Sequence, residues 1–165
     1  MKEKGIRQDI IESSLINFDL NNIFVIFTKA DRLNKVIKKQ VGIDLIENYK
    51  RAFNILNSEI QKQNFKGSAD PALFKSNFEK DLFKKIHDIR KNFTSINLEN
   101  DYDSQLSLLA SLKKEVESFF DNVIVNDNDV VIKNNRLELL KMLCNTFDKY
   151  FNFEKIEFLN EKTGI

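Results

Sequence analysis

The sequence predicts an all-α protein, a helical bundle of about six helices. Glycine and proline are scarce, with 4 and 1 among 165 residues, and a turn-rich β fold uses more of both. Apolar residues recur at three- and four-residue spacing through nearly every segment, which is the pattern of amphipathic helices. Hydrophobic residues make up 42% of the chain and include 15 phenylalanines, which is ample for the core of one domain.

Three helices are predicted in the N-terminal part of the chain. The first extends from about Ile6 to Ile16. The second follows Asp19, a residue type that caps helix N-termini, and its apolar stripe consists of Ile23, Phe27, Ala30 and Ile37. The third covers about Ile43 to Gln63, and the residues that it is expected to bury are Ile46, Tyr49, Phe53, Leu56 and Ile60.

Two more helices are predicted after the break at "KGSADP". Asp70 is expected to cap the fourth helix, with Pro71 at its first position, where the missing N–H of proline costs nothing. Its inward residues are expected to be Phe74, Phe78, Leu82, Ile86, Ile89 and Phe93. The fifth helix is expected from about Asp103 to Phe120, with an apolar face of Leu106, Leu109 and Val116.

The sixth helix is expected to begin within "NDNDV", since short Asn and Asp side chains turn the chain and cap helices. Its inward residues are expected to be Ile132, Leu139, Leu143 and Phe147. Residues 152–165 then form a short tail, which Phe153, Ile156 and Phe158 can dock on the bundle.

Classical catalytic equipment is missing from the sequence. The only histidine, His87, lies on a lysine-rich helix and is expected at the surface, because a general base needs a positioned partner. The only cysteine, Cys144, lies beside core positions and is expected to be a buried structural thiol. The sequence has no glycine-rich phosphate loop and no metal-ligand spacing. We therefore expect the chain by itself to be non-catalytic and to hold no metal.

The cellular compartment is indicated by the same composition. One cysteine forms no internal disulfide, no apolar run is long enough to span a bilayer, and the N-terminus lacks an apolar signal core. These features favour a cytoplasmic protein with no membrane partner.

Charge is uneven along the middle of the chain, although the net charge is only +1. Residues 50–91 contain 10 basic and 5 acidic residues, whereas residues 92–130 contain 2 and 8. One interpretation is ordinary solvated helix faces. The other is a basic surface for a phosphate backbone, beside an acidic segment that limits non-specific binding. The sequence leaves both open.

The segment "FFDNVIVNDNDVVIKNNRLELL", residues 119–140, combines many residue types in a short space. Adjacent helical positions point about 100° apart, so one of Phe119 and Phe120 can seal the core while the other flanks the loop. Residues 123–125, Val-Ile-Val, are expected to form a buried crossover. Arg136 can pair with Asp121 and lock this corner, or it can contact a phosphate or a base.

At these residues the chain resembles the C-terminal DALR-type anticodon-binding domain in the β subunit of bacterial heterotetrameric glycyl-tRNA synthetase. Upstream, "YKRAFNIL" places the family's Lys-Arg pair and Asn-Ile-Leu on Lys50, Arg51, Asn54, Ile55 and Leu56. Downstream, the family's FFD-x-V-x-V and NRL-x-LL elements fall on Phe119, Phe120, Asp121, Val123 and Val125, and on Asn135, Arg136, Leu137, Leu139 and Leu140. Where the family reads Asp-x-Ala-Leu-Arg, this chain has Asp129, Val131, Ile132 and Lys133, which keeps the charge but not the planar guanidinium.

The resemblance implies an organisation and a function. Residues 43–152 would form the anticodon-binding domain, residues 1–42 the end of the preceding β-subunit region and residues 153–165 a tail, so the chain would be a C-terminal piece of a longer subunit. It would hold the anticodon arm of glycine tRNA and no cofactor of its own, while the α subunit of an α2β2 tetramer uses ATP to attach glycine. The implied partners are glycine tRNA, the α subunit and the remainder of the β subunit.

The matched motifs also supply candidate tRNA-binding residues: Lys50, Arg51, Asn54, Phe120, Lys133, Asn135 and Arg136. From the resemblance we expect Arg136 to be partly exposed and close to a basic face formed by Lys50 and Arg51.

Two alternatives remain open. One is a structural module that docks on the same synthetase through an exposed apolar patch on the first two helices or the tail. The other is the equivalent domain of arginyl-tRNA synthetase, against which "YKRAFNIL" argues because it follows the glycine-type β subunit.

Overall fold

The computed structural model describes residues 5–16, 23–60, 64–95 and 101–157. These residues form helices and no strand, so the all-α prediction is confirmed. The α-helices are α1 (Gln8–Ser13), α2 (Ile23–Val36), α3 (Gln40–Ile60), α4 (Asn77–Ser95), α5 (Tyr102–Ala110), α6 (Lys113–Asn122) and α7 (Val130–Phe147). Two short 3-10 helices are η2 (Pro71–Leu73) and η3 (Phe153–Lys155). No helix within these ranges is long and apolar enough to cross a membrane.

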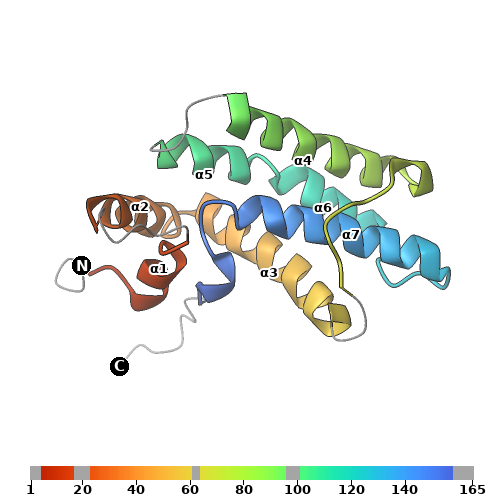
Figure 1. Ribbon diagram of the computed structural model, residues 1–165, viewed down its shortest axis with the longest axis horizontal. Coiled ribbons are helices and arrows are strands. Elements are labelled where there is room, and N and C mark those ends of the chain that lie inside the picture. The colour runs from red at the N-terminus through yellow and green to blue at the C-terminus, as the bar shows by residue number, and fades with distance from the viewer. Residues whose placement is uncertain (1–4, 17–22, 61–63, 96–100, 158–165) are drawn as a thin grey trace.

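The helix α7 is the centre of the bundle. It packs along α3 and against α4, which also packs on α6 (Figure 1). Asn135, Arg136 and Leu137 are consecutive and all buried. Because consecutive residues point about 100° apart, burial of all three encloses this turn on every side. Figure 1 shows α1, α2 and η3 at one end of the molecule and the connection between α6 and α7 at the other.

Two helix boundaries differ from the prediction. Asp70 does cap a helix, but it is the short η2, in which the Asp70 carboxylate accepts the N–H of Ala72 and Pro71 occupies the first position. The long α4 begins only after Ser76. The expected helix over residues 103–120 is divided into α5 and α6 at Ser111. The Ser111 hydroxyl donates to the Leu108 carbonyl at 2.7 Å, a local contact of the kind that competes with helix continuation.

Three residues that were expected to point inward are exposed instead. Ile23 is 68% exposed at the start of α2, Phe78 is 38% exposed at the start of α4, and Ile124 is 78% exposed between α6 and α7. Each lies at a helix end or in a connection, where fewer neighbouring elements are available to cover it. The predicted cap Asp19 and the predicted docking residue Phe158 lie outside the described residues.

The chain after α7 returns to the bundle through an aromatic cluster. Phe153 is fully buried, and its ring packs on Tyr49, Phe147 and Phe151 with centroid distances of 5.6, 5.4 and 5.9 Å. The N–H of Asn152 donates to the Ser13 carbonyl at 2.8 Å, which ties this segment to α1. Ile156 is also fully buried. The predicted docking through Phe153 and Ile156 is confirmed.

A half-buried carboxyl lies beside this cluster. Burial raises the pKa of Asp148 to about 6, although hydrogen bonds from the Tyr49 hydroxyl and the Phe153 N–H oppose the shift. The fold therefore favours the protonated form of Asp148. The resulting stabilisation is fully present below the ordinary pKa of 3.8 and is lost as pH rises through about 6.

The variant Asp148→Asn isolates this effect because its side chain does not titrate. The free energy of unfolding of the wild-type chain, relative to that of Asp148→Asn, should fall as pH rises from about 4 to about 6, and should level off above that. Urea denaturation of both proteins across this pH range measures the difference. A difference that stays constant between pH 4 and 7 would contradict the shifted pKa.

Candidate nucleic-acid interface

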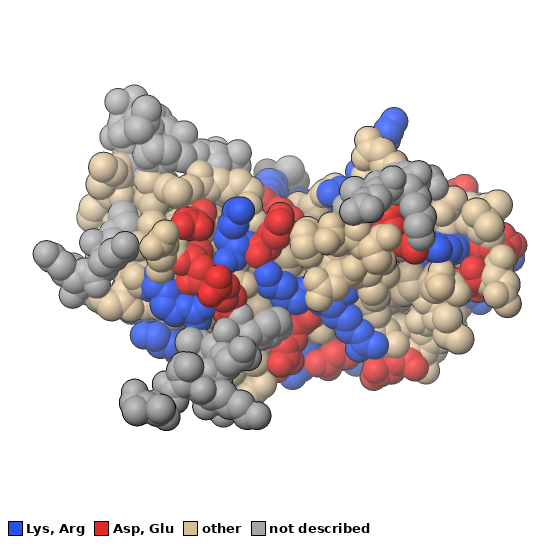
Figure 2. All heavy atoms as spheres, turned by 90° about the horizontal axis from the view of Figure 1, so that it is seen from below, with Lys and Arg blue, Asp and Glu red and all other residues tan. Residues whose placement is uncertain are grey.

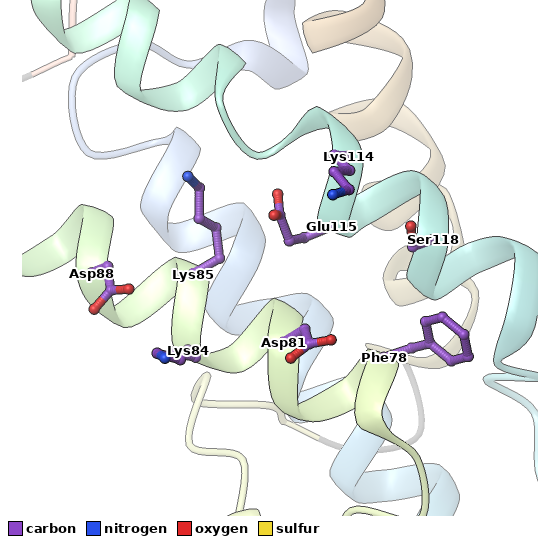
Figure 3. A pocket seen from close by; sticks show the side chains of 8 residues that line it. All are labelled: Phe78, Asp81, Lys84, Lys85, Asp88, Lys114, Glu115 and Ser118. Atoms are coloured by element: carbon purple, nitrogen blue, oxygen red, sulfur yellow. The ribbon is translucent and has the colours of Figure 1, made fainter.

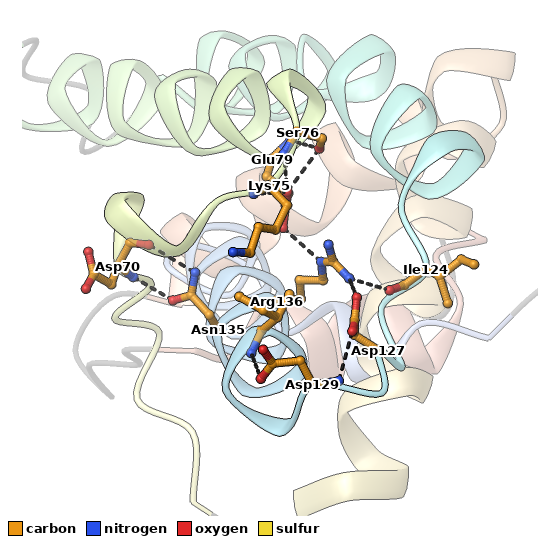
Figure 4. Close-up of polar contacts among 10 residues, drawn as sticks. Asp70, Lys75, Ser76, Glu79, Ile124, Asp127, Asp129, Asn135 and Arg136 are labelled. Atoms are coloured by element: carbon orange, nitrogen blue, oxygen red, sulfur yellow. Dashed lines mark hydrogen bonds and ion pairs between the residues drawn. The ribbon is translucent and has the colours of Figure 1, made fainter.

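The guanidinium of Arg136 is the centre of a buried polar network (Figure 4). Its Nε donates to Glu79 Oε1 at 2.8 Å, and its Nη1 donates to Asp127 Oδ2 at 2.6 Å and to the Ile124 carbonyl at 2.9 Å. Only 7% of the residue is exposed. One side chain of α7 thus fixes the start of α4 and the connection between α6 and α7.

Glu79, the main partner of Arg136, belongs to a capping box at the start of α4. Its Oε2 accepts the backbone N–H of Ser76 at 2.7 Å and that of Lys75 at 2.8 Å, while the Ser76 hydroxyl accepts the N–H of Glu79 at 3.4 Å. Burial raises the pKa of Glu79, but the hydrogen bonds from Arg136 and Ser76 outweigh it and leave this pKa below its ordinary value. Glu79 is therefore a buried carboxylate with its charge compensated.

The expectation for Arg136 is wrong in two respects. The residue is enclosed in the core rather than partly exposed, and it pairs with Glu79 and Asp127 rather than with Asp121, which is exposed at the end of α6. The physical reason is the enclosed position of α7, since a charge on a buried helix needs compensating partners from the elements that surround it. The interpretation of a corner locked by an ion pair describes this geometry, with different partners.

Two other candidates on α7 are also engaged within the protein. Asn135 is buried, accepts the N–H of Asp70 at 2.7 Å and donates to the Asp70 carbonyl at 3.0 Å, so it holds the segment before η2. Lys133 forms an ion pair with Glu59 at the end of α3, at 3.1 Å. These contacts organise the end of the bundle around the α6–α7 connection.

A further residue that the sequence analysis missed is Glu138. Its Oε2 accepts the backbone N–H groups of Lys66, Gly67 and Ser68 at 3.0, 2.6 and 2.9 Å. Gly67 has φ +78°, which is strained for residues with a Cβ, and this geometry lets the N–H groups converge on one oxygen. Glu138 thereby fixes the connection between α3 and α4. No local motif marks such a contact, because the partners lie 70 to 72 residues apart.

The exposed part of the matched motifs lies where α3 packs on α6. The Arg51 guanidinium lies over the Phe120 ring at 4.3 Å and donates to the Phe120 carbonyl at 3.5 Å. Asn54 is exposed one turn further along α3, and the Lys50 ammonium donates to the Glu154 carbonyl at 2.7 Å. A guanidinium stacked on a ring keeps donors at its edge, so Arg51 and Asn54 together offer hydrogen bonds to solvent or to a ligand.

Phe119 and Phe120 occupy the two roles expected for this pair only in part. Phe119 is fully buried and seals the core, as predicted. Phe120 is only 8% exposed because Arg51 covers its ring. Stacking of a base on Phe120 would therefore require displacement of the Arg51 side chain.

The opposite charges of the two middle segments are brought together by the fold. The helix α4, from the basic segment, packs against α6, from the acidic segment. On the face of the molecule drawn in Figure 2, basic and acidic side chains lie beside one another throughout the part that is not grey. This face is an ordinary mixed-charge surface rather than a single basic one.

His87 and Cys144 are found where the sequence predicts. His87 is exposed, and its ring contacts that of Phe83 at 4.4 Å. Cys144 is buried, and burial raises the pKa of its thiol to about 12. Such a thiol is almost wholly protonated at neutral pH and is a poor nucleophile.

The fold and these contacts define a helical binding domain, in which a rigid core presents charged and amide side chains on its surface. The model of the DALR anticodon binding domain family matches residues 45–161, and the chain therefore belongs to this family. The division of the chain at residues 42 and 152 stays a prediction.

Curated relatives agree with the resemblance that the motifs indicated. The chain is 42% identical over 142 residues to the glycine–tRNA ligase beta subunit of Rickettsia prowazekii, a match that covers 85% of this chain and 21% of that protein. It is 40% identical over 145 residues to the corresponding subunit of Rickettsia bellii, with 87% and 21% covered. The chain thus spans about a fifth of the length of the curated relatives that it matches.

Proposed function

We propose that this chain is the anticodon-binding part of a glycine–tRNA ligase β subunit and that it binds the anticodon arm of glycine tRNA. The match to the anticodon-binding family over residues 45–161 carries this proposal, and the names of the relatives supply the amino acid. Attachment of glycine with ATP would belong to an α subunit, in an α2β2 enzyme of the cytoplasm, and this chain would need no cofactor.

The physical task is binding without chemistry. Single-stranded anticodon bases can be splayed apart and recognised by stacking and by hydrogen bonds to their edges, while basic side chains hold the backbone. Among the candidate residues, Arg51 and Asn54 are exposed and can contact RNA directly, with Lys50 beside them. We assign Arg136, Asn135 and Lys133 an indirect role, because their side chains are held by Glu79, Asp70 and Glu59.

Titration of the chain with glycine tRNA, and with the same tRNA carrying another anticodon, tests the proposal. The glycine anticodon should be preferred by roughly 1–3 kcal/mol for each base that is read bidentately. Equal affinity for the two tRNAs, or no binding to either, would remove the anticodon role.

The variant Arg51→Ala separates a backbone contact from a base contact. If Arg51 holds a phosphate, its loss should weaken both tRNAs similarly and reduce the slope of log affinity against log salt by about 1. The matched control is Arg32→Ala, which removes an exposed arginine of α2 that pairs with Asp103 at 3.2 Å, outside the family match. If both variants bind as the wild type does, Arg51 lies outside the RNA surface.

A second candidate function is favoured by one observation. Ile23 and Phe24 are 68% and 75% exposed at the start of α2, and Val41 and Ile43 are 43% and 39% exposed at the start of α3. Such side chains suit a docking contact with the rest of the synthetase. Co-purification of the α subunit with the wild-type chain, and its loss with Phe24→Ser, would favour this role.

A further inference from the structure

A cleft of about 400 Å³ opens between residues 78–88 of α4 and residues 114–118 of α6 (Figure 3). Three lysines line it, Lys84, Lys85 and Lys114, together with the carboxylates of Asp81, Asp88 and Glu115. Figure 3 shows the side chains of Lys85 and Glu115 extending from opposite helices into the space between them. This α4–α6 cleft is distinct from the surface of Arg51 and Asn54, which lies where α6 packs on α3.

The charges of the α4–α6 cleft are not used to hold the fold together. Within the described part of the chain, its three lysines form no ion pair, whereas the neighbouring Lys113 pairs with Asp44 at 2.7 Å. Glu115 Oε2 is buried from solvent and has no hydrogen-bond partner among the described residues. Since buried acceptors in folded proteins are almost always satisfied, this oxygen is suited to a donor supplied by a ligand.

The mixed charge limits what the ligand can be. A phosphate would meet the lysines favourably but would be repelled by the three carboxylates. A ligand that presents a hydrogen-bond donor beside acceptors satisfies both kinds of group. The Watson–Crick edge of cytosine has this arrangement, with its N4 amino donor next to the N3 and O2 acceptors, and carboxylates accept hydrogen bonds from cytosine N4. Uracil has an acceptor, O4, in place of the amino group.

An aromatic side chain at one end of the cleft completes the match. Phe78 is 38% exposed and lies near Ser118 in Figure 3. Glu115 is three residues before Ser118, which is about 4.5 Å along the helix axis. A base stacked on the Phe78 ring therefore has its edge within reach of Glu115 and Lys85. Stacking on aromatic side chains is the usual way in which proteins hold unpaired bases.

We propose that the α4–α6 cleft binds an unpaired cytosine of RNA. Glu115 accepts from its N4 amino group, Lys85 donates to its O2 or N3, and Phe78 stacks on the ring. This inference rests on the proposed function, and it agrees with it, because glycine codons begin with two guanines and their anticodons carry the complementary cytosines. The exposure of Phe78, which the helical pattern placed in the core, has its use here.

Binding of two RNA hairpins to the 165-residue chain tests the assignment. One is the anticodon stem-loop of glycine tRNA, and the other has its anticodon cytosines replaced by uracil. The wild type should prefer the cytosine hairpin by roughly 5-fold or more. Glu115→Gln should lose most of this preference, because an amide can donate to uracil O4 as well as accept from cytosine N4. The control Glu117→Gln removes the same charge from a half-exposed glutamate of α6 outside the cleft, and should keep the preference.

The possible outcomes separate this inference from the proposed function. If the wild type prefers cytosine and Glu115→Gln keeps that preference, the cleft assignment is overturned and the anticodon role stands. Absence of binding to either hairpin overturns both. Phe78→Leu, which keeps apolar bulk but removes the stacking face, should weaken both hairpins by a similar factor. Unchanged affinities for this variant would leave the cleft to a protein partner and overturn the assignment.

Discussion

Replacing Arg136 with alanine should lower the free energy of unfolding by about 3–5 kcal/mol. The substitution leaves Glu79, which is fully buried, without its charged partner, and it also removes the donor to the Ile124 carbonyl. An uncompensated carboxylate in the core costs far more than the loss of an exposed ion pair. Chemical denaturation of the two proteins at neutral pH measures the change.

The variant Asp127→Asn is the matched control for Arg136→Ala. Asp127 is the other acidic partner, but its side chain is 34% exposed and Arg136 keeps Glu79 when it is changed. Its cost should be on the order of 1 kcal/mol or less. Similar small costs for both variants would mean that Arg136 is solvated in solution, and the RNA-contact hypothesis for this residue would then return.

Acid provides an independent check on the same pair. The pKa of Glu79 lies below its ordinary value of 4.5, so the stabilisation from the charged pair is present above about pH 4.5 and is lost as pH falls through the lower pKa of the folded state. The stability difference between wild type and Arg136→Ala should therefore shrink below pH 4.5. A difference that grows in acid would contradict the ion pair with Glu79.

The helices could be predicted from sequence because their evidence is local. Apolar spacing of three and four residues indicates a helix wherever it occurs, and it also identified Leu82, Leu106 and Leu139 as core residues. The division between α5 and α6 escaped prediction because neither glycine nor proline marks it. The start of α4 had an available signal, the Ser-x-x-Glu pattern of Ser76 and Glu79, which the stronger Asp-Pro pattern at residues 70–71 obscured.

The polar contacts of the candidate site were harder to predict because they join distant segments. Glu79 lies 57 residues from Arg136, and a family motif that names Arg136 says nothing of that partner. The motif residues proved to be of two kinds. Arg136 and Asn135 hold α4, η2 and the α6–α7 connection in place, whereas Arg51 and Asn54 reach the surface. A recurring residue type in a binding domain can therefore shape the binding surface without touching the ligand.

The second large effect is expected from Phe153→Ala, which should cost about 3–5 kcal/mol of unfolding free energy. Phe153 is fully buried at the junction of the rings of Tyr49, Phe147 and Phe151, so its loss leaves a cavity between α3, α7 and the segment after α7. Two backbone links depend on this docking, those from Asn152 to Ser13 and from Glu157 to Asp9. Hydrogen exchange at the Asn152 and Glu157 amides should therefore accelerate together with the global loss of stability.

The control Phe24→Ala removes the same side chain from a position that is 75% exposed, and it should change stability by no more than about 0.5 kcal/mol. Denaturation of the three proteins under one set of conditions gives the comparison. If Phe153→Ala costs as little as Phe24→Ala, residues 151–157 are only loosely associated with the bundle in solution. Lys50, which donates to the Glu154 carbonyl, would then be released from its tether, and its charge would be free to join Arg51 at the RNA surface. A large cost instead means that docking of η3 holds Lys50 in place before any RNA binds.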